Sequence, residues 1–383
     1  MKICFVTHKV KKGDGQGRVN YEVILEALRQ GHEVMIIASE LSEDLAKHPK
    51  VEWRKVSAGR LPTELLRNQL FAVRTTFELL LRKRQLDLVV VNGFVTYAKS
   101  DINCIHFVHS AWLASRYHPY RERKSFSSLY QWIYTGLNRY LEQNAMKRTS
   151  VVVAVSDRVR QELIQDAGVG GERIAVIRNG VDLQEFHPNR ATRADLQLDE
   201  DKLYALFAGD IKSSRKNLDT VMKALSHVQD VHLLVVGDTT GSPYPKMAAE
   251  LGITGRVRFL GYRTNMADWM SVSDMFVYPS RYEPFALVLL EAMAAGTPVI
   301  ASRICGASEL FTDKFAIGID DPDNTEALTD AIRSLATDRE RLNMMGADAR
   351  NAALRHSWSK MAEQYVRLLE EAAVRKSMPL VEP

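Results

Sequence analysis

The stretch DMFVYPSRYEPFALVLLEAMAAGTPVIAS, residues 274–302, contains the pattern that decides the fold. It opens with a short apolar run and a polar loop, continues through an apolar, alanine-rich segment, and closes with a second short apolar run. Short runs of this kind are typical of buried strands, and the longer segment between them is typical of a helix. The stretch therefore predicts two parallel strands joined by a crossover helix.

The same alternation of strand and helix extends through the rest of the chain. The apolar runs of the first half are KICFVTH, EVMIIAS, VEWRKV, DLVVVNG, NCIHFVHS, SVVVAVS and RIAVIRNG, and those of the second half are LYALFAGD, VHLLVVGD, RVRFLG, DMFVYPS, TPVIAS and FAIGI. The alternation starts afresh near residue 203. We therefore expect an α/β protein with two doubly wound, Rossmann-like domains that face a cleft.

A polar, turn-rich segment at residues 179–201 separates the two halves, and it contains Asn-Gly and His-Pro breakers. We expect an N-terminal domain over residues 1–185 and a C-terminal domain over residues 186–355. An amphipathic helix is expected within residues 356–383. This helix could pack on either domain, including back on the first.

The composition is that of a globular protein with reduced thiols. The chain has 383 residues, of which 46% are hydrophobic and 26% are charged, and this length fits about two domains of roughly 150–200 residues. No run approaches the roughly 18 apolar residues that a membrane span needs, and no secretory leader is expected. Because Cys4, Cys104 and Cys305 are far apart and form no C-x-x-C pattern, we expect neither disulfides nor zinc and favour a cytoplasmic location.

Positive charge is concentrated in one part of the chain. Residues 51–150 contain 16 Lys and Arg against 7 Asp and Glu. Such a surplus suggests an anionic partner, either a membrane surface or a phosphorylated acceptor, although a solvated charged face is an equal alternative. The segment at residues 112–148 mixes aromatic residues with Arg and Lys, so it could lie on a membrane at the inner face. The alternative is a set of helices that pack on the sheet with a basic outer face.

Two loops that follow predicted strands could bind phosphate. GDGQGRVN, residues 13–20, places glycines before a helix, but the spacing is not G-x-G-x-x-G, and a simple tight turn is the alternative. In FAGDIKSSRKNLDTVMKAL, residues 207–225, Arg215 and Lys216 precede a helix at the carboxyl end of a strand. A surface Arg-Lys pair is the alternative there, but this position is where such folds bind ligands.

Glu283 and Glu291 lie on either side of an apolar stretch, and three interpretations compete. We expect the helix to begin at Pro284 or Phe285, so eight helical steps would separate the acids by roughly 12 Å, beyond the 5–9.5 Å of a glycoside hydrolase pair. A structural role suits Glu283 beside a helix start, but Glu291 lies among apolar residues. In the third interpretation, both acids bind sugar hydroxyls and the helix N–H groups bind a diphosphate between them.

These motifs, in this order, resemble glycosyltransferase family 4 and its retaining relatives with the GT-B fold. The resemblance covers nearly the whole chain. It rests on the glycine-rich first loop, the NGVD-x-x-x-F-x-P linker, the Arg-Lys pair, FLGY at residues 259–262, EPFALVLLEAMAAGTPVIAS and the C-terminal helix. Within the family, GDIKSSRKNLDTVMKAL and Cys305-Gly306 look most like lipopolysaccharide core glucosyltransferases.

The resemblance implies roles for residues of the second domain. Glu291 would bind the ribose hydroxyls, Glu283 would contact the sugar hydroxyls, and Arg215 and Lys216 would neutralise the diphosphate. Further contacts would come from the backbone N–H groups of Phe285, Ala286 and Leu287 and from a base-binding loop with Tyr262 and Thr264.

In the first domain, which would bind the acceptor, the resemblance implies phosphate contacts from the backbone of Gly15, Gln16 and Gly17. His109 matches a histidine near the donated sugar, and a satisfied core histidine is the alternative. The sequence departs from the family at Ala286, where the family often has Gly. Because the extra methyl group would narrow the sugar pocket, the identity of the donated sugar stays open.

The resemblance implies retaining transfer of a hexose from a nucleotide sugar, best UDP-glucose, to a saccharide or lipid-linked acceptor. Retention without a well-placed nucleophile suggests attack on the same face, with leaving-group charge stabilised by the protein. We expect no metal and no cofactor besides the nucleotide sugar, because Asp210 and Asp238 stand alone, and no nucleic acid partner. The alternatives are a GT-B-like epimerase, a phosphorylase, or a sugar-nucleotide-binding protein without catalysis.

Overall fold

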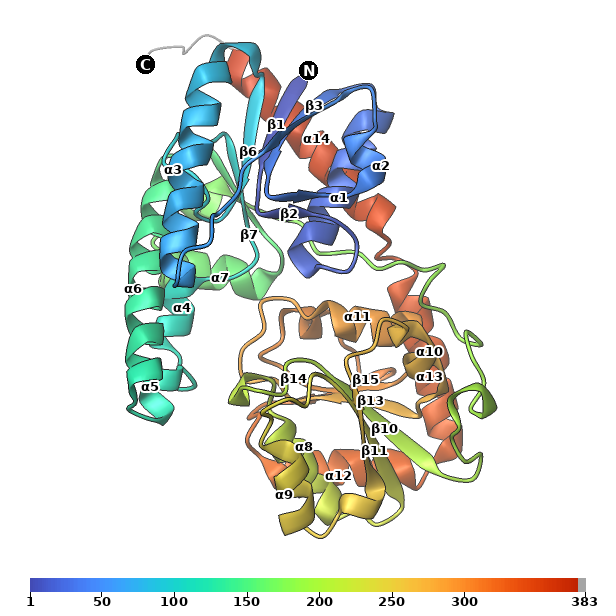
Figure 1. Ribbon diagram of the computed structural model, residues 1–383. Coiled ribbons are helices and arrows are strands. Elements are labelled where there is room, and N and C mark those ends of the chain that lie inside the picture. Colours follow the sequence, from blue (N-terminus) through green and yellow to red (C-terminus); the bar gives the residue numbers. More distant parts are fainter. Residues whose placement is uncertain (378–383) are drawn as a thin grey trace. The chain divides into compact units, whose positions relative to one another are not determined.

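The computed structural model describes residues 1–377, which fold into two compact units (Figure 1). The first unit comprises Met1–Asn179 together with the chain from Trp358 onward, and the second comprises Gly180–Ser357. The divisions at 179/180 and 357/358 lie close to the boundaries that the sequence suggested, at 185 and 355. The linker motif NGVD-x-x-x-F-x-P is therefore divided, and all of it after the asparagine belongs to the second unit.

The first unit is built on a parallel sheet of seven strands in the order β5-β3-β1-β6-β7-β8-β9. The strands are β1 (Lys2–Val6), β3 (Glu33–Ala38), β5 (Val51–Lys55), β6 (Leu88–Asn92), β7 (Ile102–Ile105), β8 (Val151–Ala154) and β9 (Ile174–Val176). Six of them lie within the runs of the first half, and β7 begins one residue before its run NCIHFVHS, so the predicted strands are confirmed. A separate two-stranded ladder of β2 (Lys9–Val10) and β4 (Glu40–Leu41) was not predicted.

Helices follow the strands of the first unit in the expected alternation. They are α1 (Gly15–Arg29), α2 (Glu43–Ala46), α3 (Glu64–Arg82), α4 (His109–Ala114), α5 (Pro119–Glu122), α6 (Phe126–Lys147), α7 (Asp157–Gln165) and α14 (Trp358–Ser377), with 3₁₀ turns η1 (Lys83–Gln85) and η2 (Gly171–Arg173). Alternate residues of the central strands, such as Cys4 and Met35, pack against Phe71 and Leu79 of α3. Every second residue of these strands therefore packs on the buried apolar face of the amphipathic helix α3.

The second unit contains a parallel sheet of six strands in the order β12-β11-β10-β13-β14-β15. The strands are β10 (Leu203–Ala208), β11 (Val231–Val236), β12 (Val257–Gly261), β13 (Met275–Tyr278), β14 (Val299–Ser302) and β15 (Ala316–Ile319). All six coincide with the apolar runs of the second half. The predicted architecture of two parallel, doubly wound α/β sheets is therefore confirmed.

The remaining elements of the second unit cover this sheet. The helices are α8 (Leu218–Ser226), α9 (Tyr244–Glu250), α10 (Met266–Val272), α11 (Leu287–Ala294), α12 (Thr325–Ala336) and α13 (Arg339–Ala353), and the 3₁₀ turns are η3 (Ala194–Leu196), η4 (Ser214–Lys216), η5 (Thr254–Arg256) and η6 (Gly306–Leu310). Arg350 of α13 donates hydrogen bonds to the carbonyls of Phe186 and Ala294, both at 2.7 Å. The linker segment is thereby attached to α13 and to the end of α11.

The C-terminal helix α14 packs against α1 within the first unit. Arg18 of α1 lies over the Trp358 ring at 5.5 Å, and Lys376 forms an ion pair with Asp101 at 2.9 Å. Trp358, Met361, Tyr365 and other apolar side chains of α14 are buried. Within residues 1–377, no helix has both the length and the apolar character that a membrane crossing requires.

Candidate functional site

Two loops of the second unit meet where the strand order reverses. The chain runs from β10 outward to β11 and β12 on one side and to β13, β14 and β15 on the other, so the loops after β10 and β13 are neighbours at the carboxyl edge. Such a point is where open α/β sheets bind ligands. The loop after β10 carries Arg215 and Lys216, and the loop after β13 carries Glu283. The topology thus brings together three of the residues selected from the sequence.

Lys216 and Glu283 form an ion pair whose side chains are only 12% and 15% exposed. Tyr278 donates its hydroxyl to the same Glu283 carboxylate at 3.2 Å, and the Lys216 ammonium lies 5.4 Å from the Tyr278 ring centroid. Burial alone would raise the pKa of Glu283, but the charges of Lys216 and Arg215 and the hydrogen bonds from Lys216 and Tyr278 outweigh it, so the pKa is lowered. Glu283 is therefore a carboxylate at neutral pH.

Arg281, which the sequence analysis missed, fixes the loop that carries the two cations. Its backbone N–H donates to the Arg215 carbonyl at 2.9 Å, and its guanidinium donates to the Ser214 carbonyl and to Asp219 of α8, both at 2.8 Å. A second contact is formed with Asp323 at 2.8 Å. From the sequence alone, Arg281 is one more polar loop residue, because its partners lie tens of residues away.

Asn217 completes this arrangement at the start of α8. It adopts a left-handed conformation (φ 64°), its side-chain oxygen caps the Thr220 N–H, and its amide donates to the carbonyls of Pro279 and Pro322 at 2.9 and 2.6 Å. Asparagine tolerates this conformation better than most residues. The loops after β10 and β13 are thus joined by buried hydrogen bonds, so that the backbone that carries Arg215 and Lys216 is held in place before any ligand arrives.

The helix after β13 starts later than predicted. α11 begins at Leu287, not at Pro284 or Phe285, because Ala286 takes a left-handed conformation (φ 76°, ψ 75°) that a helix cannot include. The Glu283 and Phe285 carbonyls accept hydrogen bonds from the N–H groups of Gly306 and Ala307, at 3.0 and 2.7 Å. Residues 283–285 are therefore paired to the chain after β14 instead of being helical.

Glu291 lies in the second turn of α11 and is partly buried, whereas the alanines around it are fully buried. Because α11 begins at Leu287, the chain from Glu283 to Glu291 contains four helical steps and not the eight on which the expected separation was based. Tyr262 and Thr264 follow β12 at the same carboxyl edge, and both are exposed. They are free to contact a ligand but are not held by the buried network.

The glycine-rich loop of the first unit forms the first turn of α1. Asp14 is the N-cap, and its carboxylate accepts the Gly17 N–H at 2.8 Å. A Cβ on Gly17 would lie 3.0 Å from that carboxylate oxygen, so a larger residue there would require Asp14 to shift by a few tenths of an ångström. Because the Gly17 N–H is committed to the cap, the expected phosphate contacts of this loop are reduced to the N–H groups of Gly15 and Gln16.

His109 is the first residue of α4 and follows β7. Glu142 of α6, whose side chain is only 3% exposed, accepts a hydrogen bond from the His109 backbone N–H at 3.1 Å and lies 3.3 Å from Nδ1. In this geometry Nδ1–H donates to the carboxylate, and Nε2 remains on the other side of the ring. His118, by contrast, is buried with both ring nitrogens hydrogen-bonded, to Thr135 and to the Tyr120 N–H. It is a satisfied core histidine.

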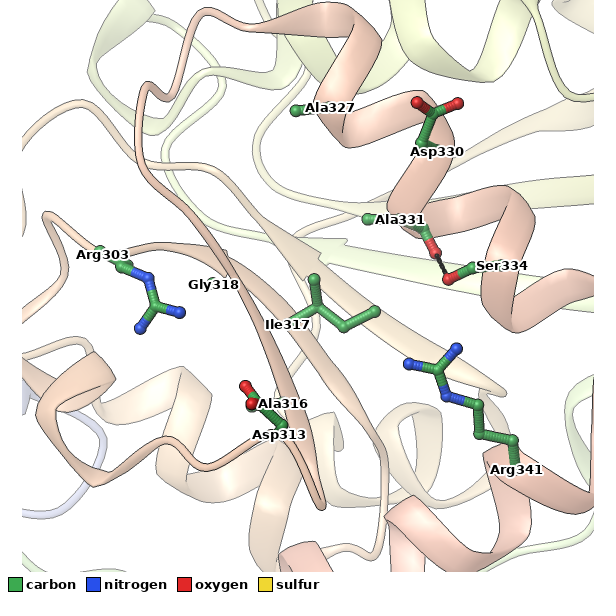
Figure 2. A pocket seen from close by; sticks show the side chains of 10 residues that line it. All are labelled: Arg303, Asp313, Ala316, Ile317, Gly318, Ala327, Asp330, Ala331, Ser334 and Arg341. Carbon is green, nitrogen blue, oxygen red and sulfur yellow. Dashed lines mark hydrogen bonds between the residues drawn. The ribbon is translucent and has the colours of Figure 1, made fainter.

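A hollow of about 380 Å³ in the second unit lies away from these residues (Figure 2). It is lined by β15, α12 and the beginning of α13, and Figure 2 shows Arg303 and Arg341 on opposite sides of it, with Asp313 and Asp330 also among its walls. Arg303 is already paired with Asp320 at 3.2 Å. The charges of the hollow balance, β15 is an edge strand separated from β13 by β14, and no residue selected from the sequence lines the hollow.

Potential metal ligands do not gather in this part of the chain. Among residues 1–377, no three His, Cys, Asp or Glu side chains form a group that could hold a metal ion. Asp238 forms an ion pair with Lys212 at 2.5 Å, and Asp210 accepts hydrogen bonds from the Lys212 N–H and the Ser213 hydroxyl, at 2.9 and 2.8 Å.

Comparison with known protein families assigns both halves of the chain. Residues 13–185 match the family described as Glycosyltransferase Family 4, and residues 188–352 match Glycosyl transferases group 1. A lipopolysaccharide core biosynthesis mannosyltransferase, LpsB, from Rhizobium meliloti is 30% identical over 270 residues, which are 66% of this chain and 72% of that protein. A D-inositol 3-phosphate glycosyltransferase from Streptomyces bingchenggensis is 32% identical over 251 residues, which are 60% of this chain and 55% of that relative.

Solved structures share the fold over the whole chain. Sucrose-phosphate synthase from Thermosynechococcus elongatus superimposes with a TM-score of 0.79 at 20% identity, over 97% of this chain and 98% of that one. WaaG, a glycosyltransferase involved in lipopolysaccharide biosynthesis, gives 0.77 at 20% identity, over 96% and 99% of the two chains. HepE from Anabaena, solved in complex with UDP and glucose, gives 0.73 at 20% identity, over 97% and 99%.

Proposed function

Because the chain belongs to glycosyltransferase family 4, we propose that it transfers a hexose from a nucleotide diphosphate sugar, UDP-glucose, to a saccharide or lipid-linked acceptor, with retention at the anomeric carbon. The observation that carries the proposal is the set of preorganised cations, Arg215 and Lys216, beside Glu283 at the switch point of the second sheet. HepE was solved with UDP and glucose, which supports a uridine nucleotide. LpsB is named a mannosyltransferase, so the sugar itself requires an experiment.

The charges of the site suit the departure of a diphosphate. When the bond between the anomeric carbon and the diphosphate oxygen breaks, negative charge develops on that oxygen, and Arg215 and Lys216 stabilise it. The acceptor hydroxyl attacks from the same face, and its proton passes to the departing phosphate. Since Lys216 and Tyr278 already hold one Glu283 oxygen, Glu283 is positioned to bind a sugar hydroxyl and not to act as a nucleophile. We propose no metal.

The other selected residues extend this proposal. Glu291 would bind the ribose, and the loop with Tyr262 and Thr264 would contact the base. The N–H groups of Phe285, Ala286 and Leu287, at and before the start of α11, would bind phosphate oxygens. In the first unit, Gly15 and Gln16 would contribute two further N–H groups, and His109 would contact the sugar through Nε2 with Glu142 holding its ring.

A panel of nucleotides tests the proposal. Thermal unfolding is measured with UDP, GDP and ADP and with their sugar conjugates, on wild type and on Glu291→Ala, with Glu250→Ala of α9 as an exposed control. Stabilisation by the uridine compounds that Glu291→Ala abolishes and Glu250→Ala keeps is the expected result. Stabilisation by guanosine or adenosine compounds would refute the UDP assignment, and no stabilisation at all would favour a protein without a working nucleotide site. Product analysis separates transfer from epimerisation, because only transfer consumes the acceptor.

We also propose that the first unit contacts an anionic membrane through the outer face of α3 and α6. The two helices lie side by side (Figure 1), with the Leu65 N–H and the Asn68 amide donating to the hydroxyls of Tyr130 and Tyr134, at 3.4 and 3.2 Å. The membrane face exposes large apolar side chains from both helices, namely Leu66, Val73, Phe77, Leu80, Leu81, Phe126, Leu129, Trp132, Ile133 and Tyr140. Exposed cations border it, namely Arg67, Arg74, Arg121, Arg123, Lys124 and Arg139. Apolar side chains bordered by cations suit an anionic bilayer surface.

Sedimentation with vesicles tests the membrane face. The triple variant Phe77→Ser, Leu81→Ser and Phe126→Ser removes apolar residues that are 65%, 76% and 94% exposed. The control is Met344→Ser, which removes a 57% exposed side chain of the second unit. Wild type and the control should bind vesicles with anionic lipid at low salt, and the triple variant should not. Equal binding by all three proteins, or none by wild type, would contradict the proposal.

A further inference from the structure

A set of cations separate from Arg215 and Lys216 gathers in the first unit, at the amino ends of β7, β8 and β9. A pocket of about 490 Å³ is lined by Lys99, Lys147, Arg148, Thr149, Ser150 and Arg173, and we call it the basic pocket. Lys99, Ser150 and Arg173 each stand within three residues of the start of a strand, β7, β8 and β9 respectively. These three strands are neighbours in the sheet. The basic pocket therefore lies at the amino edge of the strands, whereas His109 and the glycine-rich loop follow their carboxyl ends.

The basic pocket contains no acid. Its lining has four cationic and two hydroxyl side chains, and in residues 1–377 none of the four cations forms an ion pair with a carboxylate. Two acids lie close to the lining residues in the sequence. Asp101 is engaged by the Lys376 ammonium and the Val89 N–H, at 2.9 and 2.8 Å, and Glu172, next to Arg173, is exposed and does not line the pocket. Four like charges around one hollow repel one another and raise the local concentration of anions.

Two of the cations are fixed before any ligand binds. The Arg173 guanidinium donates to the carbonyls of Met146, at 2.6 Å, and Thr149 at the end of α6, and the Arg148 guanidinium donates to the Tyr97 carbonyl at 3.1 Å. Each guanidinium has five N–H donors, so most of them remain for a ligand. A guanidinium that is already oriented loses less entropy when it binds the oxygens of a phosphate. Lys99 and Lys147 are exposed and can move onto the same anion.

We propose that the basic pocket binds the phosphate monoester group of a ligand that is distinct from the nucleotide sugar. Two nearly fixed guanidiniums and two mobile ammonium groups match the charge and the oxygens of a phosphate dianion. The lining contains no aromatic or large aliphatic side chain, so it recognises the phosphate and not an apolar part of the ligand. The phosphate could belong to a free phosphate ester or to a lipid headgroup, and the chemistry of the pocket is the same for both. This inference does not depend on the proposed transfer reaction.

The test measures phosphate binding by two variants of equal charge. Lys99→Gln with Lys147→Gln removes two charges from the basic pocket, and the control Lys47→Gln with Lys83→Gln removes two charges from exposed sites elsewhere in the first unit. Calorimetry with glycerol 3-phosphate provides the solution arm. Sedimentation with phosphatidylcholine vesicles, with or without phosphatidic acid, provides the lipid arm, and all proteins in it also carry Phe77→Ser, Leu81→Ser and Phe126→Ser so that the membrane face does not mask the pocket. We expect the dissociation constant to rise about tenfold or more in the pocket variant and to stay unchanged in the control.

The outcomes separate the two sources and the two sites. If the pocket variant loses the binding of glycerol 3-phosphate, a free phosphate ester is sufficient as a ligand. If it loses only the binding to vesicles with phosphatidic acid, the ligand is the phosphate of a lipid headgroup. Arg215→Gln, in the second unit, should retain the binding. If the pocket variant binds phosphate as tightly as wild type in both arms, if Arg215→Gln abolishes the binding, or if wild type binds in neither arm, the proposal is overturned.

Discussion

Replacing Ala286 by glycine should reveal conformational strain at the start of α11. Ala286 has φ 76° and ψ 75°, a conformation that costs an L-residue about 1–2 kcal/mol and costs glycine almost nothing. Glycine has two penalties of its own, about 0.5–1 kcal/mol of backbone entropy and about 0.8 kcal/mol for the lost burial of a methyl group. The relief of strain at residue 286 nearly cancels the two penalties of glycine. Ala286→Gly should therefore change the free energy of unfolding by less than about 1 kcal/mol.

The matched control for Ala286→Gly lies in the same helix. Ala292 is fully buried inside α11, so Ala292→Gly incurs both penalties and relieves nothing. The two variants should therefore differ by about 1–2 kcal/mol, which is the strain at Ala286. Urea unfolding provides the measurement, and hydrogen exchange of peptides from β13 and β14 isolates the second unit. If both variants are destabilised equally, Ala286 is unstrained and the reasoning is refuted. UDP binding should survive Ala286→Gly, because the N–H group remains.

Three other predictions concern the buried charges. Lys216→Ala should lower the free energy of unfolding by about 1.5–3 kcal/mol, because Glu283 keeps its burial and loses its cation, and adding Glu283→Gln should restore part of this loss in urea unfolding. Since the folded-state pKa of Glu283 is lowered, its stabilising contribution is present above its unfolded pKa of about 4.3 and is lost as the pH falls through the folded value. The stability of Glu283→Gln should accordingly fall less than that of wild type on acidification, and an equal fall would contradict the assignment. Glu142→Gln should lower kcat about tenfold or more with little change in KM, because His109 loses the carboxylate that orients it, whereas the exposed Glu64→Gln should leave both unchanged in the same assay.

The strands were predictable because their signal is local. Each apolar run between turn residues is long enough to define a strand, and parallel sheets bury both faces, so every run in the list corresponds to a strand of one of the two sheets. Sequence position also predicted which loops carry the cations, since Arg215 and Lys216 follow β10 and Glu283 follows β13. The ion pair between Lys216 and Glu283 follows from the strand order, which places the loops after β10 and β13 side by side.

The remaining features depend on contacts that no local pattern specifies. Alanine is a strong helix former, so nothing in EPFALVLL predicts that Ala286 is left-handed and delays the helix. Glu142 resembles any polar residue on an amphipathic helix, and its hydrogen-bond partner His109 is 33 residues away. Arg281 likewise bonds to Asp219, 62 residues earlier. In each case the tertiary structure determines the role, and the sequence supplies only the residue type.

The return of α14 to the first unit has a consequence for the order in which the protein is made. Residues 180–357 leave the ribosome before Trp358, so the second unit has all of its sequence while the first still lacks the helix that packs on α1. Until then, the surface of α1 that α14 covers is exposed to solvent and to other chains. The contact between α1 and α14 joins residues more than three hundred positions apart, and such long-range contacts form slowly. Completion of the first unit is therefore a late step, because it follows the synthesis of the whole second unit. A chaperone that binds nascent chains would find its apolar target on α1.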